Sequence, residues 1–252
     1  MPFIAPKNVI SVISGGEFMS TKTKRKLIAY ILAAIIALAG YFLNNADNSG
    51  TGSTDADSWF QSVGEFCGEP YVEVNDNIPF FTEEEITDQS FEEYGDTDYL
   101  ERCTPCTASI SRDLMPTEER GYIGYIKPSG WQNEKYDFVD GKYVYNRCHL
   151  IGFQLTGEND NRQNLITGTR YMNTEGMLPF ENEVAEYVKS TGNHVMYRVT
   201  PVFEGENLLA SGVLMEALSV EDNGKGICFN VYCYNVQPGV IIDYSTGENF
   251  EE

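Results

Sequence analysis

Three runs rich in β-branched and aromatic residues follow one another near the C-terminus, and they constrain the fold more than any other feature of the chain. They read HVMYRVTPVF (194–203), ASGVLMEALSV (210–220) and GICFNVYCYNV (226–236), and turns rich in Gly, Asn or Asp separate them. Runs of this composition between short turns are typical of neighbouring strands. They predict an antiparallel sheet that contains the C-terminal strands of the domain.

Three shorter strand-like segments precede these runs. GYIGYIKPSGW (121–131) is strand-like until its Pro and Gly residues stop it. Residues 142–151 and 165–169 have the same character, and the cluster Asn-Asp-Asn at 159–161 marks a turn between them. The last two segments therefore predict a hairpin.

A helix is predicted directly after this hairpin. From Arg170 onward, apolar side chains recur at the amphipathic spacing, as at Phe180, Val184 and Val188, and Gly192 ends the pattern. The order along the chain is sheet, hairpin, helix and sheet. This order predicts an α+β domain with an antiparallel sheet core.

The N-terminal part predicts export. Residues 1–26 form an extension with a basic end, and LIAYILAAIIALAGYFL (27–43) carries no charge, a combination typical of export signals. As a helix these 17 residues would span roughly 26 Å, slightly less than a hydrocarbon core of about 30 Å. Ala37 and Ala39 resemble a cleavage site, but the apolar run continues to Leu43. This favours an uncleaved membrane anchor over a signal peptide, and both place the rest of the chain outside the cytoplasm, anchored or secreted.

Residues 44–58 are polar and rich in glycine, which predicts a flexible linker. From Trp59 onward aromatic and β-branched residues return. We therefore expect a single globular domain at 59–252, long enough to bury its own core.

Charge is unevenly distributed, although the net charge of −21 argues against a polyanionic partner. Residues 58–101 carry 13 acidic and no basic side chains, and residues 171–252 carry 13 acidic and 3 basic ones. Residues 102–170 carry 9 basic and 8 acidic side chains. A phosphate group would meet the least repulsion in this central stretch, whereas the acidic flanks serve solubility.

Six cysteines in an exported chain favour disulfides. Cys103 and Cys106 form a lone CxxC. A structural zinc site would require a second pair at comparable spacing, and a redox CxxC would require a βαβ pattern; the sequence shows neither. A local disulfide and free thiols both stay open.

One of the two histidines, His149, ends the strand-like run YVYNRCHLIG (143–152). Asn164 follows the predicted turn, Asn173 stands where the helix begins, and Glu181 follows eight residues later. Singly, these residues have ordinary structural interpretations as a hydrogen-bonding histidine, a turn residue and a helix cap. Their order and spacing together indicate a site.

The sequence resembles the DNA/RNA non-specific endonucleases of the ββα-metal superfamily, from about Tyr71 to Gly247, and particularly exported streptococcal and other Firmicute members. The family pattern is an Asp-Arg-Gly-His motif, an Asn nine residues before the metal-binding Asn, and a Glu eight residues after it. NRCH (146–149), NLITGTRYMN (164–173) and GMLPFE, which ends at Glu181, match these spacings. The resemblance implies a ββα-metal hairpin–helix motif as the active site.

Carried over residue by residue, the resemblance implies that His149 is the general base and that Asn173 holds Mg²⁺, with Mn²⁺ as an alternative. Arg147, Asn164 and Glu181 would support the metal's waters or the phosphate. These residue types suit the chemistry. A neutral imidazole takes a proton from water near neutral pH, an amide oxygen suits Mg²⁺, and an arginine offers a planar fork to phosphate.

Two residues depart from the family motif, because Asn146 stands where Asp is frequent and Cys148 where Gly is frequent. Arg120 is a candidate for a further positive clamp on the phosphate, since the family uses an upstream arginine; a solvated surface arginine is the alternative. His194 lies outside the matched pattern, and we interpret it as structural.

Three functions are compatible with these features. The first is an exported, Mg²⁺-dependent endonuclease that hydrolyses DNA, with RNA as a further candidate substrate, without sequence preference. The second is a surface-tethered nucleic-acid-binding module whose catalysis has decayed, for which the changes at Asn146 and Cys148 leave room. The third is a secreted interaction domain whose acidic surface binds cations or a basic partner.

Overall fold

The computed structural model describes residues 59–252. The predicted N-terminal extension, apolar segment and linker lie outside the described residues. Within 59–252, every helix is too short or too polar to cross a membrane.

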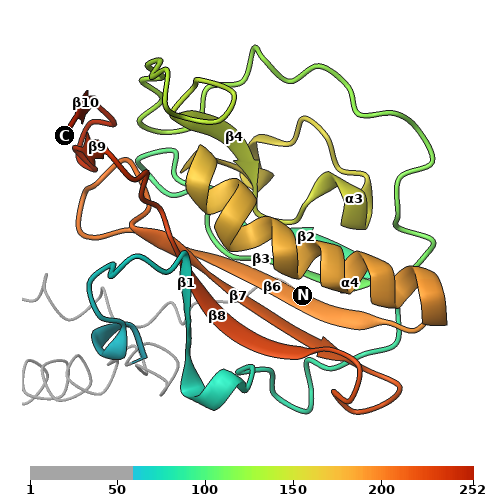
Figure 1. Cartoon of the computed structure of the whole chain (residues 1–252). Coiled ribbons are helices and arrows are strands. Elements are labelled where there is room, and N and C mark those ends of the chain that lie inside the picture. The colour runs from blue at the N-terminus through green and yellow to red at the C-terminus, as the bar shows by residue number, and fades with distance from the viewer. Residues whose placement is uncertain (1–58) are drawn as a thin grey trace, which may run out of the picture. The chain divides into compact units, whose positions relative to one another are not determined.

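A six-stranded antiparallel sheet forms the centre of the domain (Figure 1). Its strand order is β1-β8-β7-β6-β3-β2. The strands are β1 (Tyr71–Glu73), β2 (Phe91–Tyr94), β3 (Cys106–Ile110), β6 (Val195–Val202), β7 (Gly212–Ser219) and β8 (Cys228–Tyr234). β6, β7 and β8 are the three C-terminal runs, and they pair in sequence order through the loops 203–211 and 220–227. The predicted antiparallel sheet is confirmed.

A second, two-stranded antiparallel sheet pairs β4 (Tyr145–His149) with β5 (Leu165–Thr169). Its connection contains the short helices α3 (Phe153–Thr156) and η3 (Arg162–Asn164). A π-helix, η4 (Met172–Met177), follows β5 and leads into α4 (Leu178–Thr191). The predicted hairpin and helix are therefore present, in the predicted order.

α4 ends where the sequence predicts. Gly192 adopts φ 78°, and its N–H donates to the carbonyl of Val188, which is a left-handed helix end that favours glycine. The buried stripe of α4 consists of Glu181, Val184, Ala185 and Val188. Three apolar residues and one carboxylate thus share the face that packs against the core.

The predicted strand at 121–131 is wrong, because this segment consists of turns and irregular backbone. Two of its carbonyls, those of Gly124 and Ile126, accept hydrogen bonds from the side chain of Arg147. These two carbonyls are thereby satisfied by a side chain and not by the backbone of a neighbouring strand.

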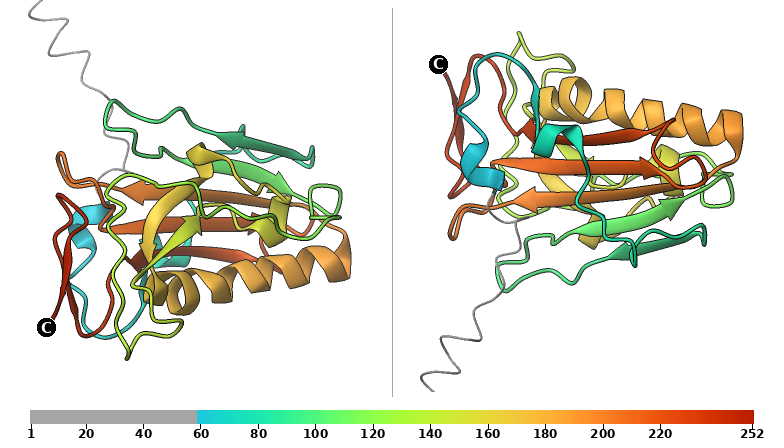
Figure 2. Two further views of the ribbon diagram at one scale, coloured as in Figure 1. Left: turned by 90° about the horizontal axis from the view of Figure 1, so that it is seen from above. Right: turned by 90° about the horizontal axis from the view of Figure 1, so that it is seen from below.

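The main core lies between the sheet, the β4–β5 hairpin and α4. It joins Cys148, Met172, Met177, Val184 and Val188 to Tyr197, Met215 and Val231 of the sheet. Figure 1 shows α4 running across the sheet on the same side as β4 and α3, and Figure 2 shows this arrangement from above and from below. The hairpin and helix that carry the predicted site residues are thereby fixed to one face of the sheet.

The other face of the sheet is covered by the segment that includes η1 (Trp59–Ser62) and η2 (Asn75–Asn77). Here Trp59, Phe60 and Phe80 pack against Leu214 and Tyr232. A third apolar cluster joins Val144, Tyr145 and Leu209 to the C-terminal strand β9 (Val240–Ile242), which pairs with β10 (Asn249–Glu251).

Candidate active site

A cavity of about 730 Å³ is lined by β4, the loop before it, η4 and the start of α4. It collects most of the residues that the sequence singled out. They are Arg120, Asn146, Arg147, His149, Asn173 and Glu181.

His149 lies at the end of β4 and is 6% exposed. Its Nε2 is 2.8 Å from the carbonyl oxygen of Asn159, and its Nδ1 is 3.1 Å from Nη2 of Arg120. A carbonyl only accepts and a guanidinium only donates, so Nε2 carries the proton and Nδ1 offers its lone pair. The backbone therefore sets the tautomer of this imidazole.

The pKa of His149 is lowered to about 4. Burial is the main cause because it disfavours the imidazolium, and the positive charge of Arg120 acts in the same direction. The hydrogen bond to Asn159 opposes both. The imidazole is consequently neutral at physiological pH, as a proton acceptor must be.

Arg120 belongs to an exposed loop, yet its guanidinium reaches His149. The sequence left a solvated surface arginine open as the alternative. The structure instead places this side chain in the cavity, beside Nδ1.

The guanidinium of Arg147, which was expected to bind phosphate, has other partners in the structure. Its Nε and Nη2 donate to the carbonyls of Ile126 and Gly124, each at 2.5 Å. Its guanidinium also lies 4.2 Å from the ring centroid of Trp131. The edge that would grip a phosphate in a bidentate manner already holds the backbone of the preceding loop.

Asn164 does not line the cavity, although the resemblance implied that it supports the metal's waters or the phosphate. It is fully buried, its Oδ1 accepts from the N–H of Ile151 at 2.8 Å, and its Nδ2 donates to the carbonyl of the same residue at 2.9 Å. Its side chain fixes the chain just after His149. It therefore positions the hairpin.

Glu181 lies on the buried stripe of α4 and faces the cavity. Burial raises the pKa of Glu181 to about 7, although Gln154 and Arg120 lower it. Within residues 59–252 this carboxylate makes no ion pair. The carboxylate lies against Gly152, where a Cβ would come within 2.6 Å of its Oε2, so a larger residue at 152 would displace the carboxylate.

Asn173 is the second residue of η4 and is a half-buried member of the cavity lining. Its Oδ1 lies 3.0 Å from the Sγ of Cys148. The thiol donates this hydrogen bond and Oδ1 accepts it, so the bond links β4 of the hairpin to η4. One lone pair of Oδ1 stays available for another partner.

The donor chemistry of the cavity fits a hard divalent cation. Asn173 contributes a neutral amide oxygen and Glu181 a buried carboxylate without a counter-ion. Mg²⁺ prefers oxygen ligands and retains several waters, so one or two protein oxygens suffice. In the described part of the chain, His, Cys, Asp and Glu form no cluster of three or more suited to a metal, so the donors that the cavity offers are these two oxygen groups.

Two contacts around the candidate site were not predicted from the sequence. The carbonyl of Asn159 holds His149, but any residue type offers a carbonyl, so the sequence gives no signal for it. Cys148 is buried on the core side of β4, where it contacts both Asn173 and Met177. Strand alternation predicts that Cys148 points away from His149; it does not predict the contact between Cys148 and Asn173.

The other cysteines lie elsewhere, and all six thiols of the chain are free. Burial raises the pKa of Cys103 to about 11 and that of Cys106 to about 12. Of the two possibilities that the sequence left open, the structure has free thiols.

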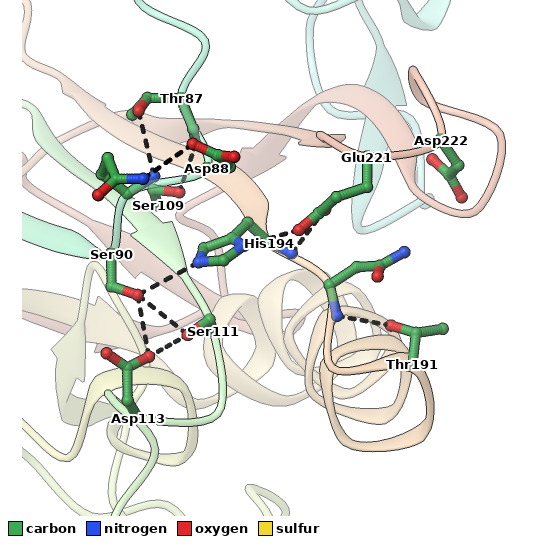
Figure 3. A network of polar contacts seen from close by, with 12 residues as sticks. Thr87, Asp88, Ser90, Ser109, Ser111, Asp113, Thr191, His194, Glu221 and Asp222 are labelled. Atoms are coloured by element: carbon green, nitrogen blue, oxygen red, sulfur yellow. Dashed lines mark hydrogen bonds and ion pairs between the residues drawn. The ribbon is translucent and has the colours of Figure 1, made fainter.

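His194 lies outside the cavity, in a network that Figure 3 shows. Its Nδ1 is 2.7 Å from Glu221 and its Nε2 is 3.3 Å from the hydroxyl of Ser90. Ser90 also contacts Ser111 and Asp113. The network ties the start of β2 and the end of β3 to the loops beside β6 and β7, which supports the interpretation of His194 as structural.

Comparisons with known proteins bear on the family and the fold of this chain. A family model described as DNA/RNA non-specific endonuclease matches residues 82–221, more than half of the chain. A deoxyribonuclease of Streptococcus dysgalactiae subsp. equisimilis is 32% identical over 110 residues, which are 42% of this chain and 32% of that protein. The chain thus spans about a third of the length of that relative.

Solved structures share the fold. NucA from Streptococcus agalactiae with bound magnesium has a TM-score of 0.64 and 24% identity, over 71% of this chain and 86% of that one. Sda1 nuclease with a bound zinc ion has a TM-score of 0.60 and 23% identity, over 73% and 97%. A structure described as an extracellular endonuclease has a TM-score of 0.52 and 19% identity, over 74% and 100%. At these identities the likeness establishes an α+β fold with an antiparallel sheet.

The family match covers β2 to β7 and therefore contains both the hairpin and α4. His149, Asn173 and Glu181 all fall within it. The chain belongs to the DNA/RNA non-specific endonuclease family, a family of phosphodiester hydrolases.

Proposed function

We propose that this protein is an exported, Mg²⁺-dependent endonuclease that hydrolyses DNA without sequence preference, with RNA as a further candidate substrate. One observation carries the proposal. The imidazole of His149 is neutral, has its tautomer set by the carbonyl of Asn159, and shares a cavity with the oxygen donors Asn173 and Glu181.

His149 is proposed as the general base. Its Nδ1 accepts a proton from the attacking water while the water oxygen bonds to phosphorus and the bond from phosphorus to the leaving oxygen breaks. The hydrogen bond from Nε2 to Asn159 stabilises the imidazolium that forms. The low pKa of the resting histidine makes the base available over a broad pH range.

Asn173 and Glu181 are proposed to hold the divalent cation, Mg²⁺ or alternatively Mn²⁺, within the ββα-metal motif formed by the β4–β5 hairpin and α4. When bound, the cation would neutralise charge on the phosphate and on the leaving oxygen. A cation beside Glu181 would also favour its ionised form, which burial disfavours.

Arg120 is proposed to contact the phosphate. Its guanidinium lies at Nδ1 of His149, where the attacking water must sit. The residue is exposed, so its side chain can exchange this nitrogen for a phosphate oxygen as substrate binds. Arg147 and Asn164 are proposed to act indirectly, because they fix the loop and the hairpin that carry the site.

Export is proposed from the basic flank and apolar run at residues 22–43, which lie outside the described residues. On this proposal residues 59–252 form the nuclease domain, anchored to the membrane or secreted, and 44–58 form its linker. Treatment of intact cells with protease should then remove the domain. Survival of the domain while a known surface protein is digested would contradict this topology.

The direct test of the function uses the full chain and a circular plasmid. We expect nicked and then linear DNA in Mg²⁺, no cleavage in EDTA, and recovery when excess Mg²⁺ is added. Binding without cleavage under all conditions would support the alternative of a nucleic-acid-binding module whose catalysis has decayed. A protein that neither binds nor cleaves the plasmid would support the alternative of a secreted interaction domain.

Cys148 offers a test of how Asn173 is positioned. Replacing Cys148 with alanine removes the donor to Oδ1 of Asn173, and we expect the apparent affinity for Mg²⁺ to weaken several-fold, up to about tenfold. Cys148→Ser keeps a donor and should stay close to the parent. Equal Mg²⁺ dependence of cleavage for the alanine variant and the parent would show that the thiol does not position Asn173.

A further inference from the structure

We propose that Tyr122 forms a stacking subsite for an unpaired nucleobase beside the scissile phosphate, so that single-stranded or locally unpaired nucleic acid is the preferred substrate class. The inference rests on the proposed function, because it takes the cavity with His149 as the cleavage site. It adds a base-binding surface to groups that act only on the phosphate.

The ring of Tyr122 is open to solvent although it lines the cavity. Its side chain is 81% exposed, and it shares the cavity with His149 and Arg120. Tyr122 packs into none of the three apolar clusters. An exposed aromatic ring at the edge of a polar cavity therefore has a face available to a ligand.

The backbone beside this ring is anchored. The hydroxyl end of the Tyr122 ring lies against Gly124, where a Cβ would collide with it. The carbonyl of Gly124 accepts from Arg147 at 2.5 Å, and Arg147 is in turn stacked on Trp131. Tyr125, whose ring centroid is 6.4 Å from that of Tyr122, donates a hydrogen bond from its hydroxyl to Asp160. The backbone beside Tyr122 is thus anchored, and the ring, in a residue that is 81% exposed, is open to a base.

Positively charged side chains contribute little to the binding of nucleic acid in this cavity. Of its three arginines, Arg147 is bound to backbone carbonyls and Arg170 pairs with Asp140 at 2.6 Å. Only Arg120 remains for a phosphate, in a chain with a net charge of −21. Stacking of bases on aromatic side chains is insensitive to sequence and needs no cation, so it fits a non-specific site that is poor in free positive charge.

Stacking on Tyr122 selects against an intact duplex. Each base within a duplex has both faces covered by its neighbours, and only an unpaired or unstacked base exposes a face. A base flanking the scissile phosphate reaches Tyr122 once the strand is single or locally open. Substrate preference should therefore follow base accessibility more closely than charge.

The test measures binding of the full chain in EDTA, where no cleavage occurs, to three labelled DNAs: a short single strand, the same strand with abasic residues, and the matching duplex. We expect the parent to bind the normal single strand best. Tyr122→Ala should lose about tenfold in affinity for that strand and little for the abasic strand or the duplex. Tyr122→Phe should retain the parent's affinities.

Tyr99→Ala is the matched control, since Tyr99 is 77% exposed and lies outside the cavity; it should bind like the parent. Equal loss of affinity by Tyr122→Ala for the normal and abasic strands, or no loss, would overturn the subsite. Cleavage in Mg²⁺ is scored separately. A protein that cleaves without this dependence on Tyr122 refutes the subsite alone, whereas one that binds through Tyr122 and never cleaves refutes the proposed nuclease function alone.

Discussion

His149→Ala is expected to lower the rate of plasmid cleavage by roughly 10² to 10⁴, the usual contribution of a general base. The imidazole is held by Asn159 and Arg120 and contacts neither cation donor in the structure. The fold and the binding of Mg²⁺ should therefore survive the substitution. Circular dichroism and calorimetric titration with Mg²⁺ check both, beside initial rates of plasmid nicking.

The other histidine of the chain supplies the matched control. His194→Gln alters a half-buried imidazole outside the cavity, and it should cleave at the parent rate. A folded His149→Ala protein that also cleaves at the parent rate would remove His149 from the mechanism. Loss of activity in both variants would point to a general effect on the fold.

Glu181→Gln is expected to stabilise the metal-free protein at alkaline pH and to weaken its affinity for Mg²⁺. Burial raises the pKa of Glu181 to about 7 from an ordinary value of 4.5. The folded state therefore keeps a proton that the unfolded state releases, so stability falls as pH rises from about 4.5 to 7 and stays reduced above it. This difference corresponds to roughly 3 kcal/mol.

Glutamine carries no charge at any pH, so the variant should lack this loss and melt several degrees higher than the parent at pH values above 7. Addition of Mg²⁺ should raise the melting temperature of the parent more than that of the variant. Glu183→Gln is the control, because Glu183 is exposed on the same helix. If Glu181→Gln lowered the melting temperature in the absence of metal at alkaline pH, the buried charge of Glu181 would not destabilise the folded protein.

The regular elements were predictable because their signals are local. Alternation and turn residues predict β6, β7 and β8, and the amphipathic spacing with Gly192 predicts α4. The segment 121–131 has an equally strand-like composition, but it is irregular in the structure. Two of its carbonyls accept hydrogen bonds from the guanidinium of Arg147 on β4. The composition of the segment cannot predict hydrogen bonds from a side chain of another element.

The candidate residues could be named from the sequence, but their contacts could not. The resemblance to the family pointed to His149, Asn173 and Glu181, and the structure places all three in the lining of one cavity. The resemblance also implied that Asn164 and Arg147 support the metal's waters or the phosphate, whereas in the structure their polar groups bond to the backbone. A short motif fixes which residues come near one another; which donor meets which acceptor depends on the packing of distant segments.

The assignment of the cation to Asn173 is tested most directly by the Mg²⁺ dependence of plasmid cleavage for Asn173→Ala beside the parent. Loss of the amide oxygen should raise the Mg²⁺ concentration needed for half-maximal rate by at least about tenfold, and excess Mg²⁺ should restore part of the rate. An Asn173→Ala protein with the parent's Mg²⁺ dependence and the parent's rate would contradict a cation held at this residue.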